Sequence, residues 1–517
     1  MKEASQVKSA MIMKNHTQMV TLEACIGRGF SGIQMLGNLG ETCKEARDRA
    51  KTALENLGLQ LTQKKVLINL SPAHIKKEGN HFDLAIAVLL AQLHQKTPRQ
   101  IAWNRWAFIG ELDLQGTIKP VTGCTAMILG LLKCQLEGIV IPRANLAELI
   151  SLKPILSQSR IRIIGFDSIT DLLQWSDPHE IPDASEANLL KINGLTTPNF
   201  DDMMLSDDLR RLIVCVMAGR HHLLLSGTPG CGKSMFAERL ACLMQPLSME
   251  AFLDVLQIYG LSQERLPPKI LAAWPPYRSP HHSLSQQALL GTPERAGEVS
   301  LAHHGILFLD EFPEFRRDAV EALREPLETG MIHVSRAKEK ASWPAKPQVI
   351  AACNLCPCGW HGSRSEICRC STQQLLRYQS KLSGPIMDRI DIHFLMPDNR
   401  PIQWQECSAH SGQTENLRQW IRRTEEISLK RNQGFGLRWN RQLSLQQFPA
   451  ASGLSQDEFT KLLNRCAFKA SSRRSVLKIL RVARTLADCE QSEVVKQQHL
   501  QQAWKWHRPI RPLDDSF

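Results

Sequence analysis

The sequence predicts a multidomain α/β protein whose central part is a nucleotide-binding core built on a parallel sheet. Three observations predict this fold class. Residues 18–172 alternate short apolar strands with helices, a second α/β pattern with a glycine-rich loop begins at Leu209, and only helical patterns remain after about residue 400. The 517 residues can bury several cores. We therefore expect domains at 1–175, 200–400 and 401–517, with a linker at 176–199.

The first part of the chain carries alternating strand and helix signals. Strands are expected at Thr21–Cys25 and Lys65–Asn69, helices at Glu41–Leu57 and Phe82–Leu93, and a hairpin at Phe108–Ile118 that turns at Asp113–Gly116. The polar, proline-containing stretch Ser176–Asn199 has the composition of a linker. Four helices are expected after it and beyond the core, at 413–432, 455–470, 473–489 and 491–506.

A phosphate-binding loop follows the apolar run Leu223–Leu225 and precedes the helical stretch Met235–Met244. Its residues, Gly227-Thr228-Pro229-Gly230-Cys231-Gly232-Lys233-Ser234, match G-x-x-x-x-G-K-[ST]. In such a loop the backbone N–H groups surround the phosphates at a helix N-terminus. We expect Lys233 to neutralise the β and γ phosphates and the Ser234 hydroxyl to ligate Mg²⁺. The sequence therefore predicts ATP and magnesium as cofactors.

Two further apolar strands end in polar residues that suit hydrolysis. Ile306–Leu309 leads into Asp310 and Glu311, and Val349–Cys353 leads into Asn354. We expect Asp310 to hold Mg²⁺ through water and Glu311 to polarise the attacking water as general base. Asn354 can position water against the γ phosphate. Either feature alone is common at a strand end, but together with the phosphate loop they predict a hydrolytic ATPase.

The charge of the chain favours polyanionic partners. Its net charge of +12 is typical of proteins that bind nucleic acid, although a basic protein without such a partner fits the charge equally well. Only 6% of the residues are aromatic, which argues against a base-stacking platform for single strands. No run of about 18 uncharged apolar residues is present, so we expect a cytoplasmic protein without a membrane partner.

Four cysteines stand apart from the other eleven, which are scattered. Cys356, Cys358, Cys368 and Cys370 form two C-x-C pairs separated by nine residues. Four thiolates at this spacing can close a tetrahedral Zn²⁺ site of structural type, although C-x₂-C is the commoner spacing. Reduced free thiols and a labile disulfide are the alternatives, and a cytosolic location disfavours the disulfide.

Several motifs in the same order resemble the ComM/YifB family of Mg-chelatase-like AAA+ proteins. In the core these are Ser279-Pro-His-His-Ser283, Glu298-Val-Ser-Leu-Ala-His303, Leu307-Phe-Leu-Asp-Glu-Phe-Pro-Glu-Phe315, Leu323-Arg-Glu-Pro-Leu-Glu328, Cys356-Pro-Cys-Gly359 and Ser383-Gly-Pro-Ile-Met-Asp-Arg-Ile-Asp391. In the front part, Gly32–Gly37, Val66–Pro72, Lys77–Gly79, Phe82–Ile86 and Gly110–Gly116 resemble that family's Lon-protease-like domain, an α/β domain of the ribosomal S5 domain 2 type.

The resemblance implies a hexameric AAA+ ring that acts as a branch-migration helicase on recombination intermediates during natural transformation. Its partners would be branched DNA, or single-stranded or double-stranded DNA, together with recombination proteins. By position, Arg389 resembles the arginine finger that reaches a neighbour's ATP, Arg474 resembles sensor 2 on a C-terminal helical lid, and Asn354 takes the sensor-1 position. A guanidinium is always charged and can bond two phosphate oxygens, which suits both arginines.

The segment Ile332–Pro344 is expected to form a hairpin that carries Arg336, Lys338 and Lys340. In ring helicases such insertions point into the pore, where these cations would contact phosphates without reading bases. A solvated charged hairpin is the alternative.

The front domain is expected to be non-proteolytic. Lon-type proteases use a Ser–Lys dyad, whereas the matching stretch Glu78–Asp83 contains Asn80 and no serine. Two other functions share the AAA+ motifs. One is a protein-remodelling or regulatory ATPase with an inactive Lon-like domain, and the other is a Mg-chelatase-type subunit. The second typically lacks both the Lon-like domain and the four-cysteine loop.

Overall fold

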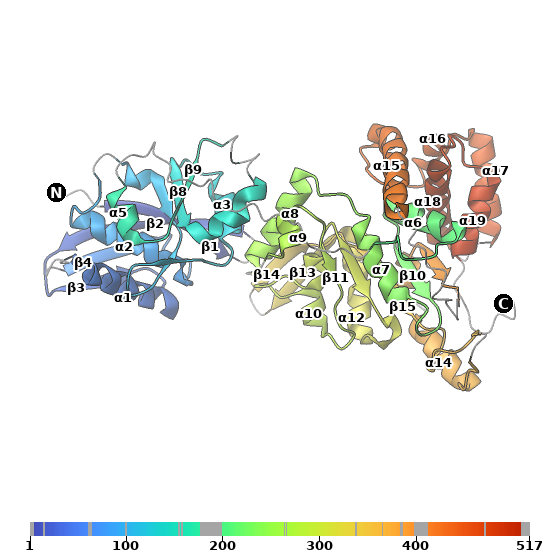
Figure 1. Ribbon diagram of the computed structural model, residues 1–517, viewed down its shortest axis with the longest axis horizontal. Coiled ribbons are helices and arrows are strands. Elements are labelled where there is room, and N and C mark those ends of the chain that lie inside the picture. Colours follow the sequence, from blue (N-terminus) through green and yellow to red (C-terminus); the bar gives the residue numbers. More distant parts are fainter. Residues whose placement is uncertain are drawn as a thin grey trace.

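The computed structural model describes residues 5–13, 16–59, 65–98, 101–152, 156, 159–175, 199–262, 264, 266–336, 339–363, 366–382, 386–397, 412–469 and 472–507. Three parts follow one another along the long axis of the molecule, with the front domain at one end, the core in the middle and the helical lid at the other end (Figure 1). The predicted linker, apart from its last residue, and the expected junction at 401 lie outside the described residues.

A seven-stranded mixed sheet forms the front domain. Its order is β3-β4-β2-β1-β5-β8-β9, with strands β1 (Ser5–Met13), β2 (His16–Gly27), β3 (Gly32–Leu36), β4 (Lys65–Ser71), β5 (Trp106–Phe108), β8 (Gly138–Pro142) and β9 (Arg162–Phe166). The strands predicted within β2 and β4 are confirmed. The predicted hairpin is also present, as β6 (Glu111–Leu112) paired with β7 (Ile118–Lys119). Strand β1 was not predicted, because the strand pattern was recognised only from residue 18, yet β1 lies at the centre of the sheet.

Helices cover both faces of this sheet. One face packs against α1 (Glu41–Asn56), α2 (Asp83–Leu93) and α5 (Ile169–Gln174), and the other against α3 (Cys124–Leu131). The described part of the domain also contains 3₁₀ segments at Asn80–Phe82, Trp103–Arg105 and Arg143–Leu152. Helix α1 buries Ala46, Ala50, Ala53 and Leu54, which follow the helical spacing expected from the sequence.

The front domain is attached to the core through α3 and α8 (Met249–Leu261), which contact each other. The two helices lie close to each other because glycines at their contact face small residues. A Cβ added at Gly260 would lie 2.5 Å from the Cβ of Ala126, and one at Gly123 would lie 2.9 Å from the Gly260 carbonyl oxygen. One continuous hydrophobic cluster therefore runs from the front sheet into the core.

The core is a five-stranded parallel sheet of order β11-β12-β15-β10-β16. Its strands are β10 (Leu223–Ser226), β11 (Tyr277–Arg278), β12 (Ile306–Leu309), β15 (Gln348–Cys353) and β16 (Ile392–Leu395), and β10, β12 and β15 are buried along their whole length. The surrounding helices are α6 (Asp207–Gly219), α7 (Lys233–Cys242), α8, α9 (Pro268–Leu271), α10 (Gln286–Leu290), α11 (Glu298–Leu301), α12 (Arg317–Ala322), α13 (Arg324–Thr329) and α14 (Thr372–Leu382). The predicted parallel nucleotide-binding fold is confirmed.

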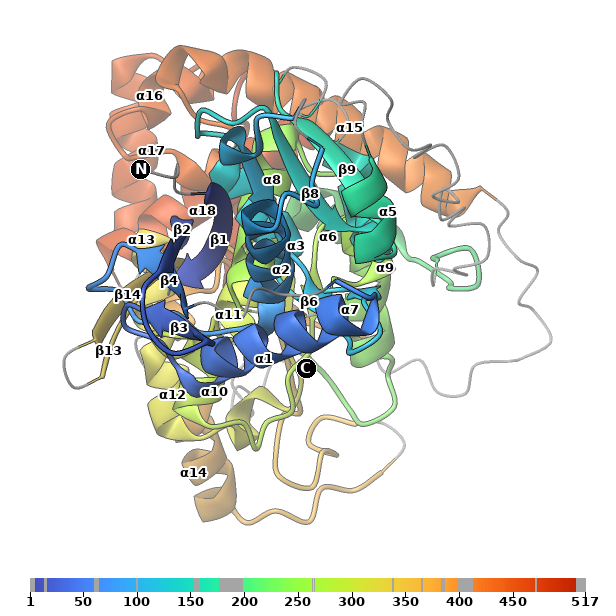
Figure 2. The same cartoon turned by 90° about the vertical axis from the view of Figure 1, so that its left-hand side faces the viewer.

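The expected hairpin is formed by β13 (Met331–Arg336) and β14 (Glu339–Pro344). It projects from the side of the core in the end-on view of Figure 2.

The lid consists of α15 (Gln413–Asn432), α16 (Phe448–Ser452), α17 (Gln456–Lys469), α18 (Arg473–Cys489) and α19 (Gln497–His507), with 3₁₀ turns at Gln433–Phe435 and Asn440–Gln442. Three predicted helices are confirmed. The fourth begins at Gln497 and not at 491, because Gln491 takes a left-handed φ of 54° that ends the preceding helix. Helix α16 was not predicted. Among the described helices, none has the length and apolarity needed to span a bilayer.

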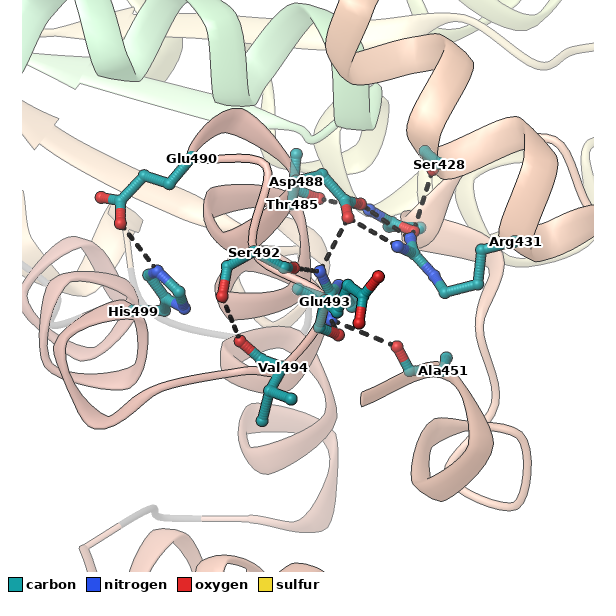
Figure 3. Close-up of polar contacts among 12 residues, drawn as sticks. Ser428, Arg431, Ala451, Thr485, Asp488, Glu490, Ser492, Glu493, Val494 and His499 are labelled. Atoms are coloured by element: carbon teal, nitrogen blue, oxygen red, sulfur yellow. Dashed lines mark hydrogen bonds and ion pairs between the residues drawn. The ribbon is translucent and has the colours of Figure 1, made fainter. Parts of the chain in front are cut away.

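A buried ionic network stabilises the lid (Figure 3). The Asp488 carboxylate on α18 is fully buried and accepts hydrogen bonds from Arg431 Nη2 at 2.7 Å, Arg484 Nη2 at 2.8 Å and Asn440 Nδ2 at 2.7 Å. Arg484 is also fully buried and donates to the Glu493 carbonyl oxygen at 2.8 Å. The network joins α15 and α18 to the loops between lid helices.

Replacing Asp488 with alanine should destabilise the lid by about 3–5 kcal/mol, because Arg484 would remain buried without its counter-charge. Native-state hydrogen exchange at the α18 amides measures this change as a lower opening free energy. The control is Asp457→Ala, which removes an exposed carboxylate from α17 and should change the opening free energy by less than about 1 kcal/mol. Equal effects of the two variants would contradict the prediction.

Candidate functional site

The predicted phosphate loop connects β10 to α7, so that Lys233 and Ser234 begin the helix. Gly230 and Gly232 have left-handed φ values of 74° and 88°, which only glycine adopts at low cost. Sheet order determines what faces this loop. Strand β15 lies between β10 and β12, and the carboxyl ends of parallel strands meet at one edge. Asn354 after β15 and Asp310 after β12 therefore reach the same edge as Lys233.

Lys233 lies at the centre of this edge and is almost fully buried. Its Nζ donates hydrogen bonds to the carbonyl oxygens of Gly227 and Thr228, both at 2.9 Å, and to Asn354 Oδ1 at 3.0 Å. The sequence predicted Lys233 and Asn354 as parts of one site from separate motifs, and the structure brings them into direct contact.

Ser234 and Asp310 are the second predicted pair that meets. The Ser234 hydroxyl donates to Asp310 Oδ2 at 2.6 Å. A hydroxyl and a carboxylate are hard oxygen donors of the kind that Mg²⁺ prefers, so these residues fit the predicted magnesium site. A phosphate group of ATP would complete the coordination of the ion.

Glu311 has an unusual backbone and an unpredicted partner. Its φ and ψ of 50° and 43° are left-handed, which is strained for a residue with a Cβ. Its carboxylate lies 3.0 Å from the Nδ1 of His282, which follows β11, the strand beside β12. His282 belongs to the Ser279–Ser283 motif, which lies in the stretch Arg278–Ser285 that the sequence suggested as a pore-facing insertion and not as part of the ATP site. His282 is thus a direct contact of the expected general base that sequence reasoning missed.

Arg389 and Arg474 come together at a single carboxylate. Arg389, in the 3₁₀ turn Met387–Arg389, and Arg474, at the start of α18, both contact Glu328 at the end of α13, and the Arg474 Nη2 to Glu328 Oε1 distance is 3.1 Å. Glu328 also lies in a motif whose individual role was not predicted. The structure therefore places the expected arginine finger and sensor 2 side by side within one chain, and their roles stay predictions.

The four predicted cysteine ligands converge. The Sγ atom of Cys356 lies 3.4 Å from that of Cys358 and 3.7 Å from that of Cys368, Cys358 and Cys368 are 3.6 Å apart, and all four sulfurs including that of Cys370 lie within 4.8 Å of one another. Although burial opposes it, backbone N–H groups of Trp360 and Arg369 lower the pKa of Cys358 to about 6. Cys353 is different, because burial raises its pKa to about 11 and its sulfur contacts Ser226 Oγ at 3.3 Å.

A second cluster, Asp254 with His303 and His304, also gathers possible ligand atoms within 4.8 Å. Its chemistry fits a metal poorly. His303 Nδ1 accepts a hydrogen bond from the Lys346 backbone N–H at 3.0 Å, so the proton of the neutral ring lies on Nε2, the nitrogen nearest Asp254. A protonated nitrogen has no lone pair to offer a cation.

Of the three cations predicted to contact DNA, the structure describes the side chain of Lys340. Lys340 is exposed on β14, opposite Ser335. Arg336 pairs with Glu339 through the backbone, and its side chain, like the whole of Lys338, lies outside the described residues.

In the front domain, the stretch expected to lack a nucleophile packs tightly. Asn80 Nδ2 donates to Glu111 Oε2 at 3.2 Å, and buried Lys77 donates to the Ile75 carbonyl oxygen at 2.8 Å. Burial lowers the pKa of Lys77. That the domain is non-proteolytic stays a prediction.

Comparisons with known proteins cover most of the chain. Family models for the ChlI subunit of magnesium chelatase match residues 22–145 and 199–403, and the model of its C-terminal region matches residues 411–507. The uncharacterised protein YifB of Salmonella typhimurium is 34% identical over 94% of this chain and 93% of its own length. Competence protein ComM of Haemophilus influenzae is 33% identical over 98% of both chains. DNA replication licensing factor mcm-6 of Caenorhabditis briggsae is 32% identical over 103 residues, 20% of this chain and 12% of that protein.

Proposed function

Because this chain belongs to the YifB/ComM family of Mg-chelatase-like AAA+ proteins, we propose that it is an ATP-hydrolysing DNA motor that drives branch migration of recombination intermediates during natural transformation. The observation that carries the ATPase part is the meeting of Lys233, Ser234, Asp310 and Asn354 at one edge of a parallel sheet. Lys233 and the loop would bind the phosphates, Ser234 and Asp310 would hold Mg²⁺, and Glu311 would activate water.

The DNA part of the proposal is supported by charge and by similarity. The net charge of +12 favours a polyanion, and the hairpin of β13 and β14, which carries Lys340, projects from the core. The relative ComM is named a competence protein, and a segment of the chain is similar to a DNA replication licensing factor. A homo-hexameric ring would bring Arg389 of one subunit to the ATP of the next.

The test is a branch-migration assay on synthetic four-way junctions with the wild-type protein and Lys233→Ala. ATP-dependent strand exchange by the wild type only is the expected result. ATP turnover is measured in parallel with forked DNA and with an unfolded protein. Stimulation by unfolded protein and not by DNA would overturn the DNA motor in favour of a protein-remodelling ATPase.

Replacing Lys338 and Lys340 with alanine should weaken DNA binding at all sequences while ATP binding persists. Each lysine that neutralises a phosphate releases a counterion, so the slope of log K against log salt should fall by about 2 for the pair. The matched control removes two exposed lid lysines, Lys430 and Lys461, and should leave that slope unchanged. Equal slopes for wild type and hairpin variant would show that the hairpin does not hold DNA.

His282→Ala should raise ATP turnover without DNA and reduce the stimulation by DNA, each several-fold. The reason is that His282 contacts the Glu311 carboxylate at 3.0 Å and lies in the segment that follows the edge strand β11. DNA that moves this segment would release the Glu311 carboxylate from His282. The control is His281→Ala, which removes the neighbouring imidazole that contacts Ser283. If both variants keep wild-type stimulation, His282 does not position Glu311.

A further inference from the structure

We propose that the four-cysteine loop binds one zinc ion and that this metal-bound loop holds the phosphate loop in position, so that ATP binding depends on the metal. The proposal rests on the ATP site described under Proposed function. It adds a coupling between two sites that their motifs do not reveal, because the contact is made between residues 130 positions apart.

The sulfur positions fit a tetrahedral metal. With a Zn–S distance of about 2.3 Å, the edges of a regular tetrahedron of sulfurs measure about 3.8 Å. The three distances among Cys356, Cys358 and Cys368 are 3.4, 3.6 and 3.7 Å. Cys370 completes the set within 4.8 Å. The cluster already has nearly the dimensions of a tetrathiolate site.

The backbone around these sulfurs also suits bound thiolates. The His361 N–H donates to Cys356 Sγ at 3.3 Å, and such bonds orient a thiolate ligand and partly neutralise it. Four thiolates brought this close would repel one another without a cation. The metal therefore keeps the loop closed, and four protein ligands leave no position for catalysis.

The cysteine loop touches the phosphate loop at one point. Gly359, one residue after Cys358, has a φ of 87°, and a Cβ added there would lie 2.4 Å from Pro229 Cγ and 3.9 Å from Asn354 Cγ. Only a glycine permits this approach, so the backbone of the cysteine loop lies directly on the tip of the phosphate loop. Cys356 also follows Asn354, the Lys233 partner, by only two residues. A shift of the cysteine loop would therefore be transmitted to both sides of the nucleotide site.

The other end of the cysteine loop is anchored to the core. Helix α14 begins two residues after Cys370 and buries Leu375 and Tyr378. The metal thus closes a loop that begins two residues after Asn354, the Lys233 partner, and ends at a helix with buried residues.

The first experiment measures the zinc content per chain and the affinity for Mg–ATP on the same preparations. Protein prepared without chelators is expected to contain about one zinc per chain, and replacement by cobalt should give the absorption of a tetrahedral thiolate site. The double variant Cys358→Ser, Cys370→Ser should lose the metal and bind Mg–ATP at least about tenfold more weakly. The control, Cys25→Ser, removes an exposed free thiol and should change neither quantity.

The second experiment compares two variants that both keep their zinc. It therefore separates the effect of the contact between the two loops from the effect of unfolding the cysteine loop. Gly359→Ala places a methyl group against Pro229. Gly362→Ala is the matched control: Gly362 also has a left-handed φ, 73°, but a Cβ added there has Leu355 Cδ1 at 3.7 Å as its nearest neighbour. Both variants should keep one zinc per chain. Only Gly359→Ala should weaken Mg–ATP binding, by about tenfold or more.

Three results would overturn the proposal. These are a metal-free wild type, zinc-depleted protein with unchanged affinity for Mg–ATP, and equal ATP affinity of the two glycine variants. A purified iron-containing protein with the reddish colour of an iron–tetrathiolate centre would overturn the assignment to zinc. Failure of the wild type to bind Mg–ATP would contradict the proposed function instead, since the zinc content is measured independently.

Discussion

Glu311→Gln should lower ATP turnover by about 10²–10⁴-fold while the protein still binds Mg–ATP. The amide keeps the size of the side chain and its contact with His282, but it cannot accept a proton from water. Lys233, Ser234 and Asp310, which are proposed to hold the phosphates and Mg²⁺, are untouched. Turnover is measured by phosphate release and binding by a fluorescent ATP analogue, with saturating DNA present.

The matched control for this prediction is Glu314→Gln. Glu314 lies three residues further along the same segment, is exposed, and contacts Lys381, so the change removes the same charge without affecting the proposed base. It should keep turnover within about twofold of the wild type. If Glu311→Gln hydrolyses ATP as fast as Glu314→Gln, another group activates the water and the role assigned to Glu311 is wrong.

Arg389→Ala should lower turnover by about 10³–10⁵-fold, because an arginine finger stabilises the charge that develops on the transferred phosphoryl group. If the finger acts between subunits, a mixture with Glu311→Gln chains should regain activity. A Glu311→Gln subunit supplies Arg389 to the site of an Arg389→Ala neighbour, which retains its own Glu311. With random mixing in a ring, about a quarter of the interfaces are complete.

The mixture is compared with each variant alone at the same total concentration. Arg316→Ala serves as the control, since it removes an exposed arginine that pairs with Asp318, two residues further along the chain, at 2.9 Å. This control should keep wild-type turnover by itself, without Glu311→Gln chains being added. A mixture no more active than the better of its two components would contradict a finger supplied in trans.

Those parts of the candidate site that belong to contiguous motifs could be predicted from the sequence. The phosphate loop, the acidic pair after β12 and the asparagine after β15 are each defined by a few neighbouring residues. The order of a parallel sheet then brings the strand ends together, which is why Lys233 and Asn354 meet as expected. Strand β1 was missed because it lies before the region in which the strand pattern was recognised, although it pairs with both β2 and β5.

The sequence by itself determined which chemical groups the site carries: a glycine-rich loop of the kind that binds triphosphate, two carboxylates proposed to hold magnesium and to activate water, and four thiols proposed to bind a metal. Only the tertiary structure decided which of these groups touch. His282 contacts Glu311, Glu328 holds both Arg389 and Arg474, and Gly359 lies on Pro229. The physical reason is that local sequence specifies residue types and backbone preferences, whereas contacts between distant segments depend on strand order and on how closely the elements pack.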